Sequence, residues 1–176
     1  MPTSTPNIYL VGLMGAGKTT IGRALARRIG YGFVDSDHEI VARTGVPIPT
    51  IFEIEGEEGF RRREAQVIAE LAGDHGRVVA TGGGVVLQQA NRDHLRSGGM
   101  VAYLRVPPRI LFERTRSDRN RPLLRVADPL ARLEALHAER DPLYREVADI
   151  VVEGGRGNAQ SITQLLAREA CLRWKL

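Results

Sequence analysis

The stretch that decides the fold is Gly12-Leu13-Met14-Gly15-Ala16-Gly17-Lys18-Thr19, which matches the pattern G-x-x-x-x-G-K-[ST] at every fixed position. It lies between an apolar run at 7–12, which predicts a buried strand, and a segment at 19–29 whose apolar residues recur every fourth position, which predicts a helix. Glycines let successive backbone N–H groups point into one concavity, and the start of the helix adds the positive end of its dipole. The stretch at 12–19, called here the phosphate loop, is therefore expected to bind the phosphates of a nucleotide.

Each residue type in the phosphate loop has a chemical use. Lys18 is expected to reach the terminal phosphates, and the Thr19 hydroxyl can bind a magnesium ion. The residues expected to contact the nucleotide here are Gly15, Ala16, Gly17, Lys18, Thr19 and Thr20. The motif alone leaves open whether the chain is a nucleotide-controlled switch, an ATPase or a small-molecule kinase.

Strand and helix patterns alternate along the rest of the chain. Further β-type runs lie at 32–35, 77–81, 100–104 and 150–153, and helical patterns begin at about 38 and span 108–116 and 159–173. The apolar face of the last helix is expected to hold Ile162, Leu165, Leu166 and Ala170. Because strands separated by helices pair in parallel through right-handed crossovers, we expect an α/β fold of three layers, α/β/α, with a five-stranded parallel sheet in a single domain, 1–176.

Two segments depart from this alternation. Residues 47–60 form a mixed stretch within a region, about 37–64, that we expect to bind the substrate. Residues 117–129 are polar, rich in arginine and interrupted by proline, which favours a mobile lid. We call residues 117–129 the lid segment.

Composition narrows the class of protein. The 176 residues carry a net charge of +4, 43% are hydrophobic, and no apolar stretch is long enough for a membrane span. The first residues lack the pattern of a secretory signal, and a single cysteine, Cys171, cannot form an internal disulfide, so we expect a cytoplasmic protein. Of the 25 basic residues only Lys18 and Lys175 are lysines, which makes the lysine of the phosphate loop conspicuous.

Polar and glycine residues follow the second and third expected strands, where ligands bind in such sheets. Asp37 or Ser36 can cap the next helix. Alternatively, Asp35 holds a water of the magnesium ion and Asp37 accepts the hydroxyl proton of a phosphate acceptor. The triplet 82–84 is either a flexible turn or a place where the backbone approaches a small ligand closely.

Arginines supply candidate anion-binding groups. In the run Arg61-Arg62-Arg63, a rotation of 100° per residue places Arg61 nearest the apolar stripe of its helix and leaves the other two toward solvent. Arg61 and Arg140 are expected to bind the carboxylate of a small anionic substrate through bidentate hydrogen bonds. Arg121, in the lid segment, is expected to bring positive charge over the triphosphate.

These residues resemble the shikimate kinase family, small P-loop enzymes similar to the nucleoside monophosphate kinases. The resemblance is carried, in order, by GLMGAGKTTIGR (12–23), DSDHEI (35–40), FRRREAQVI (60–68), TGGGVV (81–86), RPLL (121–124) and ERDPLYREVAD (139–149). It implies a P-loop kinase fold and transfer of the γ-phosphoryl group of ATP, with Mg²⁺, to the 3-hydroxyl of shikimate. The product, shikimate 3-phosphate, lies on the route to chorismate and the aromatic amino acids.

The resemblance also implies roles for individual residues. Lys18, Asp37 and Arg121 would be catalytic, and Thr19 and Asp35 would serve the metal. ATP would contact the phosphate loop together with Arg114, Arg121 and Arg156. Shikimate would contact Asp37, Phe52, Phe60, Arg61, Gly82, Gly83, Gly84 and Arg140. The family implies a monomer that acts on small molecules, with no nucleic acid or membrane as partner.

Two alternative functions stay open at this point. Another P-loop small-molecule kinase, such as a gluconate kinase, would also need arginines for a carboxylate. A nucleic-acid-stimulated ATPase would suit the positive charge, although four Phe, four Tyr and one Trp offer few platforms on which bases could stack.

Overall fold

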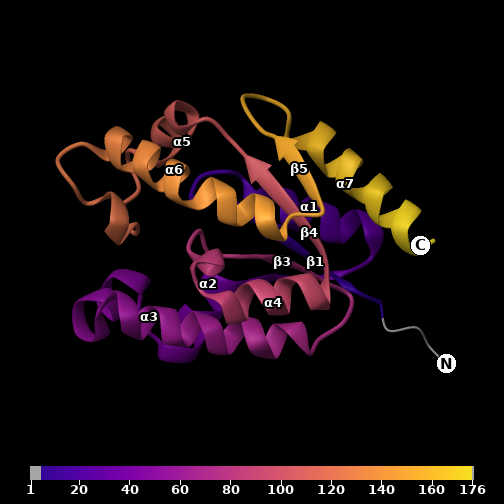
Figure 1. Ribbon diagram of the computed structural model, residues 1–176, viewed down its shortest axis with the longest axis horizontal. Coiled ribbons are helices and arrows are strands. Elements are labelled where there is room, and N and C mark those ends of the chain that lie inside the picture. Colours follow the sequence, from indigo (N-terminus) through magenta and orange to yellow (C-terminus); the bar gives the residue numbers. More distant parts are fainter. Residues whose placement is uncertain (1–4, 176) are drawn as a thin grey trace.

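Five parallel strands form the central sheet, in the order β2-β3-β1-β4-β5 (Figure 1). The computed structural model describes residues 5–175. The strands are β1 (Asn7–Val11), β2 (Gly32–Asp35), β3 (Arg77–Ala80), β4 (Gly99–Arg105) and β5 (Ile150–Glu153). Strand β1 pairs with both β3 and β4, and all five of its residues are buried because helices cover both faces of the sheet. The expected α/β/α fold with a five-stranded parallel sheet is confirmed.

Helices pack on both sides of this sheet. They are α1 (Lys18–Ile29), α2 (Ser36–Thr44), α3 (Ile48–Ala72), α4 (Gln89–Gly98), α5 (Pro108–Thr115), α6 (Pro129–Val147) and α7 (Ala159–Trp174), with short 3₁₀ turns η1 (Val85–Leu87) and η2 (Pro122–Leu124). In Figure 1, α4 and α6 lie in front of the strands and α1 lies behind them. Helices α1 and α7 contact each other, and α3 contacts α4. No helix within residues 5–175 has the length and apolar character needed to cross a membrane.

The expected elements agree with the structure to within a few residues, with two informative exceptions. On α7, Ile162, Leu166 and Ala170 are buried, but Leu165 is 39% exposed. The prediction for Leu165 was wrong because it lies at the margin of the apolar stripe, about 100° from Leu166.

The second exception is the segment 47–60, most of which is helical. Helix α3 begins at Ile48, and its two parts meet at a kink where Gly56 has φ 71° and ψ 178°. This left-handed φ is open to glycine at little cost. The kink changes the direction of the helix and breaks its apolar periodicity, which is why the sequence pattern reads as mixed before Phe60.

The loops at the carboxyl ends of the strands meet at one edge of the sheet. The phosphate loop joins β1 to α1, Asp35 ends β2, and residues 81–84 follow β3. The lid segment connects α5 to α6, and its turn η2 contacts both α3 and α6. The topology therefore brings together segments that are far apart in the sequence.

Candidate active site

Two adjoining cavities lie at this edge of the sheet. The larger has a volume of about 920 Å³ and is lined by the phosphate loop, while the smaller, of about 50 Å³, lies between α3, α6 and residues 82–84. Residues that line both are Met14, Asp37, Ile48, Gly82, Gly83, Asn120 and Arg121. The shared wall means that ligands in the two cavities would meet.

The phosphate loop has the backbone that its glycines predict. Gly15 and Gly17 have φ of 80° and 98°, and all residues from Gly15 to Thr20 line the larger cavity. The buried ammonium group of Lys18 donates hydrogen bonds to the carbonyl oxygens of Leu13, at 2.9 Å, and Gly12. Burial, and then the positive charge of Arg121, lower the pKa of Lys18 to about 7.

Thr19 and Asp35 meet on the wall of the larger cavity. The Thr19 hydroxyl donates to Asp35 Oδ2 at 2.7 Å, and Asp35 Oδ1 accepts from the backbone N–H groups of Asp37, at 3.0 Å, and His38, at 3.1 Å. Asp35 is therefore the N-cap of α2, and the capping hypothesis for Asp37 or Ser36 was wrong. The Ser36 hydroxyl instead accepts from the N–H of Gly82 at 3.1 Å. Hydroxyl and carboxylate oxygens suit a hard divalent cation, so this pair fits a magnesium ion.

Asp37 faces the point where the two cavities join. The residue is half-buried, but its Oδ1 is buried and has no hydrogen-bond partner among the described residues. Burial and the neighbouring carboxylate of Asp35 raise the pKa of Asp37. A carboxylate oxygen without a partner at a cavity wall can accept a hydrogen bond from a ligand.

Glu64 is a site residue that sequence reasoning missed. Its side chain is fully buried, and a Cβ at Gly82 would lie 2.7 Å from Asp37 Oδ1 and 2.8 Å from Glu64 Oε2. Burial raises the pKa of Glu64 to about 7. The helical spacing did indicate that Glu64 points inward, because a glutamate three positions after Arg61 and four before Ile68 falls on the apolar stripe of α3.

The two candidate arginines line the smaller cavity but differ in their partners. Arg61 is 9% exposed, and its guanidinium donates to Glu64 at 2.9 Å and Glu57 at 3.2 Å. Arg140 is 2% exposed, and its Nε and Nη1 have no hydrogen-bond partner within residues 5–175. Arg62 and Arg63 are exposed, so the inward direction predicted for Arg61 is confirmed.

The remaining predicted residues are placed as follows. Phe52 and Phe60 line the smaller cavity with their ring centroids 5.0 Å apart, beside residues 82–84. Arg121 lines both cavities and forms an ion pair with Asp118 at 3.0 Å.

Arg114 and Arg156, the two other arginines predicted to contact ATP, differ in where they lie. Arg114 lines the larger cavity and donates to the carbonyls of Gly15 at 2.9 Å and Gly155 at 2.8 Å. Arg156 alone among the predicted residues lines neither cavity, and its side chain pairs with Glu113 at 2.6 Å.

Comparisons with known proteins show which family the chain resembles. The family model described as "Shikimate kinase" matches residues 14–170. Shikimate kinase of Dechloromonas aromatica is 68% identical over 93% of this chain and 89% of its own length, and that of Aromatoleum aromaticum is 66% identical over 86% of both chains.

Among solved structures, shikimate kinases are also similar to this chain. Shikimate kinase from Acinetobacter baumannii in complex with shikimate superposes with a TM-score of 0.94 at 49% identity, covering 97% of this chain and 95% of that one. A gluconokinase from Sinorhizobium meliloti has a TM-score of 0.53 at 18% identity, over 96% of this chain and 97% of that one, a likeness of fold alone. The chain belongs to the shikimate kinase family.

Proposed function

We propose that this chain transfers the γ-phosphoryl group of ATP to the 3-hydroxyl of shikimate and forms shikimate 3-phosphate, on the route to chorismate and the aromatic amino acids. The observation that carries the proposal is the convergence of three groups on the adjoining cavities. These are the ammonium group of Lys18, the unpartnered oxygen of Asp37 and the unpartnered guanidinium nitrogens of Arg140. Membership of the shikimate kinase family supports this assignment.

The smaller cavity is proposed to hold the acceptor. Arg61 and Arg140 would bind its carboxylate, since a planar guanidinium matches a carboxylate in a bidentate pair. The N–H groups of Gly83 and Gly84 would add hydrogen bonds, and the rings of Phe52 and Phe60 would cover an apolar face of the acceptor. Asp37 Oδ1 would accept a hydrogen bond from the hydroxyl that is phosphorylated.

The larger cavity is proposed to hold ATP. The N–H groups of the phosphate loop and the Lys18 ammonium group would bind its phosphates, and nearby phosphate charge would favour the charged form of Lys18. Thr19 and Asp35 would hold Mg²⁺, which when bound neutralises charge on the transferring phosphates. Arg114, fixed between Gly15 and Gly155, would border the base, and Arg156 would reach it only after leaving Glu113.

Asp37 and Arg121 are proposed to act during transfer. Asp37 would take the proton of the attacking hydroxyl, and its raised pKa brings it closer to neutral pH, where a general base works best. Residues 120–123 of the lid segment line the smaller cavity, so this segment would open to admit the acceptor and close over it. Arg121 would then exchange Asp118 for the phosphates. A cytoplasmic monomer without nucleic acid or membrane partners is part of the same proposal.

The test is a substrate panel with the purified chain, Mg²⁺ and ATP, followed by release of ADP. Shikimate should give turnover, whereas gluconate and nucleoside monophosphates should not. Phosphorylation of gluconate without phosphorylation of shikimate would contradict the proposal. ATP hydrolysis that is stimulated by DNA or RNA and indifferent to shikimate would instead support a nucleic-acid-stimulated ATPase.

A further inference from the structure

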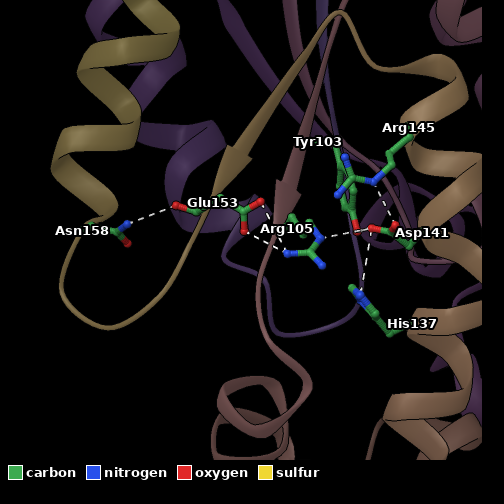
Figure 2. A network of polar contacts seen from close by, with 7 residues as sticks. All are labelled: Tyr103, Arg105, His137, Asp141, Arg145, Glu153 and Asn158. Carbon is green, nitrogen blue, oxygen red and sulfur yellow. Dashed lines mark hydrogen bonds and ion pairs between the residues drawn. The ribbon is translucent and has the colours of Figure 1, made fainter.

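Asp141, the residue after Arg140 on α6, joins this helix to strand β4 (Figure 2). Its Oδ1 accepts a hydrogen bond from the Tyr103 hydroxyl at 2.7 Å and from Arg105 Nε at 3.3 Å. Its Oδ2 accepts from Arg145 of the same helix at 2.9 Å. Although burial raises the pKa of Asp141, the hydrogen bonds from Tyr103 and Arg145 lower it overall, so the carboxylate stays ionised.

The Arg140 side chain needs support of this kind. Its Nε and Nη1 have no hydrogen-bond partner in the part of the chain that the structure describes, so hydrogen bonds from these atoms do not fix where the guanidinium lies. The adjoining backbone is also weakened, because Pro142 lies inside α6 and has no N–H to donate to the carbonyl one turn earlier. The position of Arg140 therefore depends on contacts that place this turn of α6.

A second contact supports the next turn of the same helix. The ring of Tyr144 packs against that of Tyr103 with centroids 4.8 Å apart and an interplanar angle of 35°. The Tyr144 hydroxyl donates to the carbonyl of Gly83, on the wall of the smaller cavity. Tyr103 thus contacts α6 both through its hydroxyl, on Asp141, and through its ring.

We propose that Asp141 is a positioning residue for the acceptor, which acts by fixing the turn of α6 that carries Arg140 through its hydrogen bond with Tyr103. The inference rests on the proposed role of Arg140 in binding the carboxylate of shikimate. Loss of this bond lets Arg140 leave the cavity wall, so it weakens acceptor binding while leaving the groups that contact the phosphates in place.

The contacts of Arg105 with Glu153 explain why a change at Asp141 should weaken the binding of shikimate and not that of ATP. Arg105 also pairs with Glu153 at 3.2 Å, and Asn158, which lines the larger cavity, donates to the Glu153 carbonyl at 3.3 Å (Figure 2). Asp141 is linked to these contacts only through Arg105, which keeps its pair with Glu153 when Asp141 is changed. Changes at Asp141 should therefore leave the nucleotide side of the site largely intact.

The experiment measures KM for shikimate, KM for ATP and kcat in three variants. Asp141→Ala and Tyr103→Phe should each raise KM for shikimate about tenfold, the size expected for losing a hydrogen bond to a charged group, with kcat and KM for ATP changed by less than about twofold. Asp141→Asn keeps an oxygen that can accept from Tyr103, so its KM for shikimate should stay within about threefold of the parent value. Combining Tyr103→Phe with Asp141→Ala should add little, because both remove the same bond.

Controls separate positioning from general loss of stability. Arg96 donates to the carbonyl of Glu146 and so holds α6 at a point nearer its C-terminal end. Arg145 lies on α6 itself, so its hydrogen bond with Asp141 does not join α6 to β4. Arg96→Ala and Arg145→Ala should leave KM for shikimate unchanged even if they lower the melting temperature. The inference is wrong if Asp141→Ala and Tyr103→Phe leave this KM unchanged, or if Arg96→Ala raises it equally.

Arg140→Ala distinguishes the inference from the function on which it rests. If this variant leaves KM for shikimate unchanged, the proposed role of Arg140 fails and the inference fails with it. If Arg140→Ala raises the KM but neither Asp141→Ala nor Tyr103→Phe does, only the inference is overturned.

Discussion

The guanidinium group of Arg61 packs against the backbone of Gly84 so closely that a methyl group on Gly84 would overlap its Cζ and both Nη atoms. Gly84 has φ −95° and ψ 8°, a conformation that alanine also adopts. The glycine is therefore required by the arginine beside it and not by the backbone. This relationship explains why the third glycine of the triplet matters, although it is not strained.

Gly84→Ala should displace Arg61 and weaken the binding of the acceptor carboxylate. We expect kcat/KM for shikimate to fall by about 10- to 100-fold, as for loss of one charged hydrogen-bonding partner, with KM for ATP nearly unchanged. Steady-state kinetics with each substrate varied in turn measures this. Gly73→Ala, at the end of α3 and away from both cavities, is the control and should retain parental kinetics. An unchanged kcat/KM in Gly84→Ala would contradict the proposed contact.

Lys18→Arg should be severely impaired although the charge is kept. The buried ammonium group fits between the carbonyls of Gly12 and Leu13, whereas a planar guanidinium is larger and has a fixed geometry. We expect kcat to fall by at least about 100-fold, comparable to loss of a group that stabilises the transition state. Lys175→Arg, at the exposed end of α7, should behave like the parent. Near-normal activity of Lys18→Arg would argue against a point-charge role.

Asp37→Asn should abolish most of the turnover without weakening ATP binding. The amide cannot take the proton of the attacking hydroxyl, and loss of a general base costs about 100- to 10,000-fold in kcat. Calorimetry with ATP should give a Kd within about twofold of the parent value, since Asp37 contacts the acceptor in this account. Asp93→Asn, on the exposed face of α4, is the matched control. Unchanged kcat would remove Asp37 from the chemistry.

Glu64 should make stability depend on pH. Its pKa is about 7 in the folded chain and near 4.5 when unfolded, so the folded state binds more protons between these values. The stability it contributes is full below about pH 4.5 and is lost as the pH rises through about 7. Between pH 5 and pH 8, Glu64→Gln should therefore gain stability relative to the parent by about 2 kcal/mol.

Urea unfolding of both proteins at the two pH values measures this difference. Glu58→Gln, on the same helix with an exposed ion pair to Arg62, is the control for removing a carboxylate from α3 without changing the buried site. A constant difference between Glu64→Gln and the parent at both pH values would show that Glu64 does not titrate in this range.

Local patterns predicted the phosphate loop, the strands and the inward direction of Arg61, because each depends on residues within one or two turns. Contacts between residues far apart in the sequence could not be predicted in this way. The carboxylate-binding roles of Arg61 and Arg140 were predicted from the residue type and agree with the family resemblance, but only the fold shows that their partners differ. Glu64 was missed because charged residues usually lie on the solvated face of a helix.

Two further features depend on contacts between elements. The kink at Gly56 hid the helical pattern before Phe60. The ion pair of Arg156 with Glu113 joins residues 43 positions apart, and no spacing rule predicts it. The connection from Asp141 to Tyr103 likewise exists only once α6 packs on β4.

The most direct test of the central claim compares shikimate with its neutral carboxamide, in the parent protein and in Arg140→Ala. If the smaller cavity binds the carboxylate, the parent should prefer shikimate by about 100-fold or more in kcat/KM, and Arg140→Ala should reduce this preference to less than about tenfold. An equal preference in the two proteins would contradict the account.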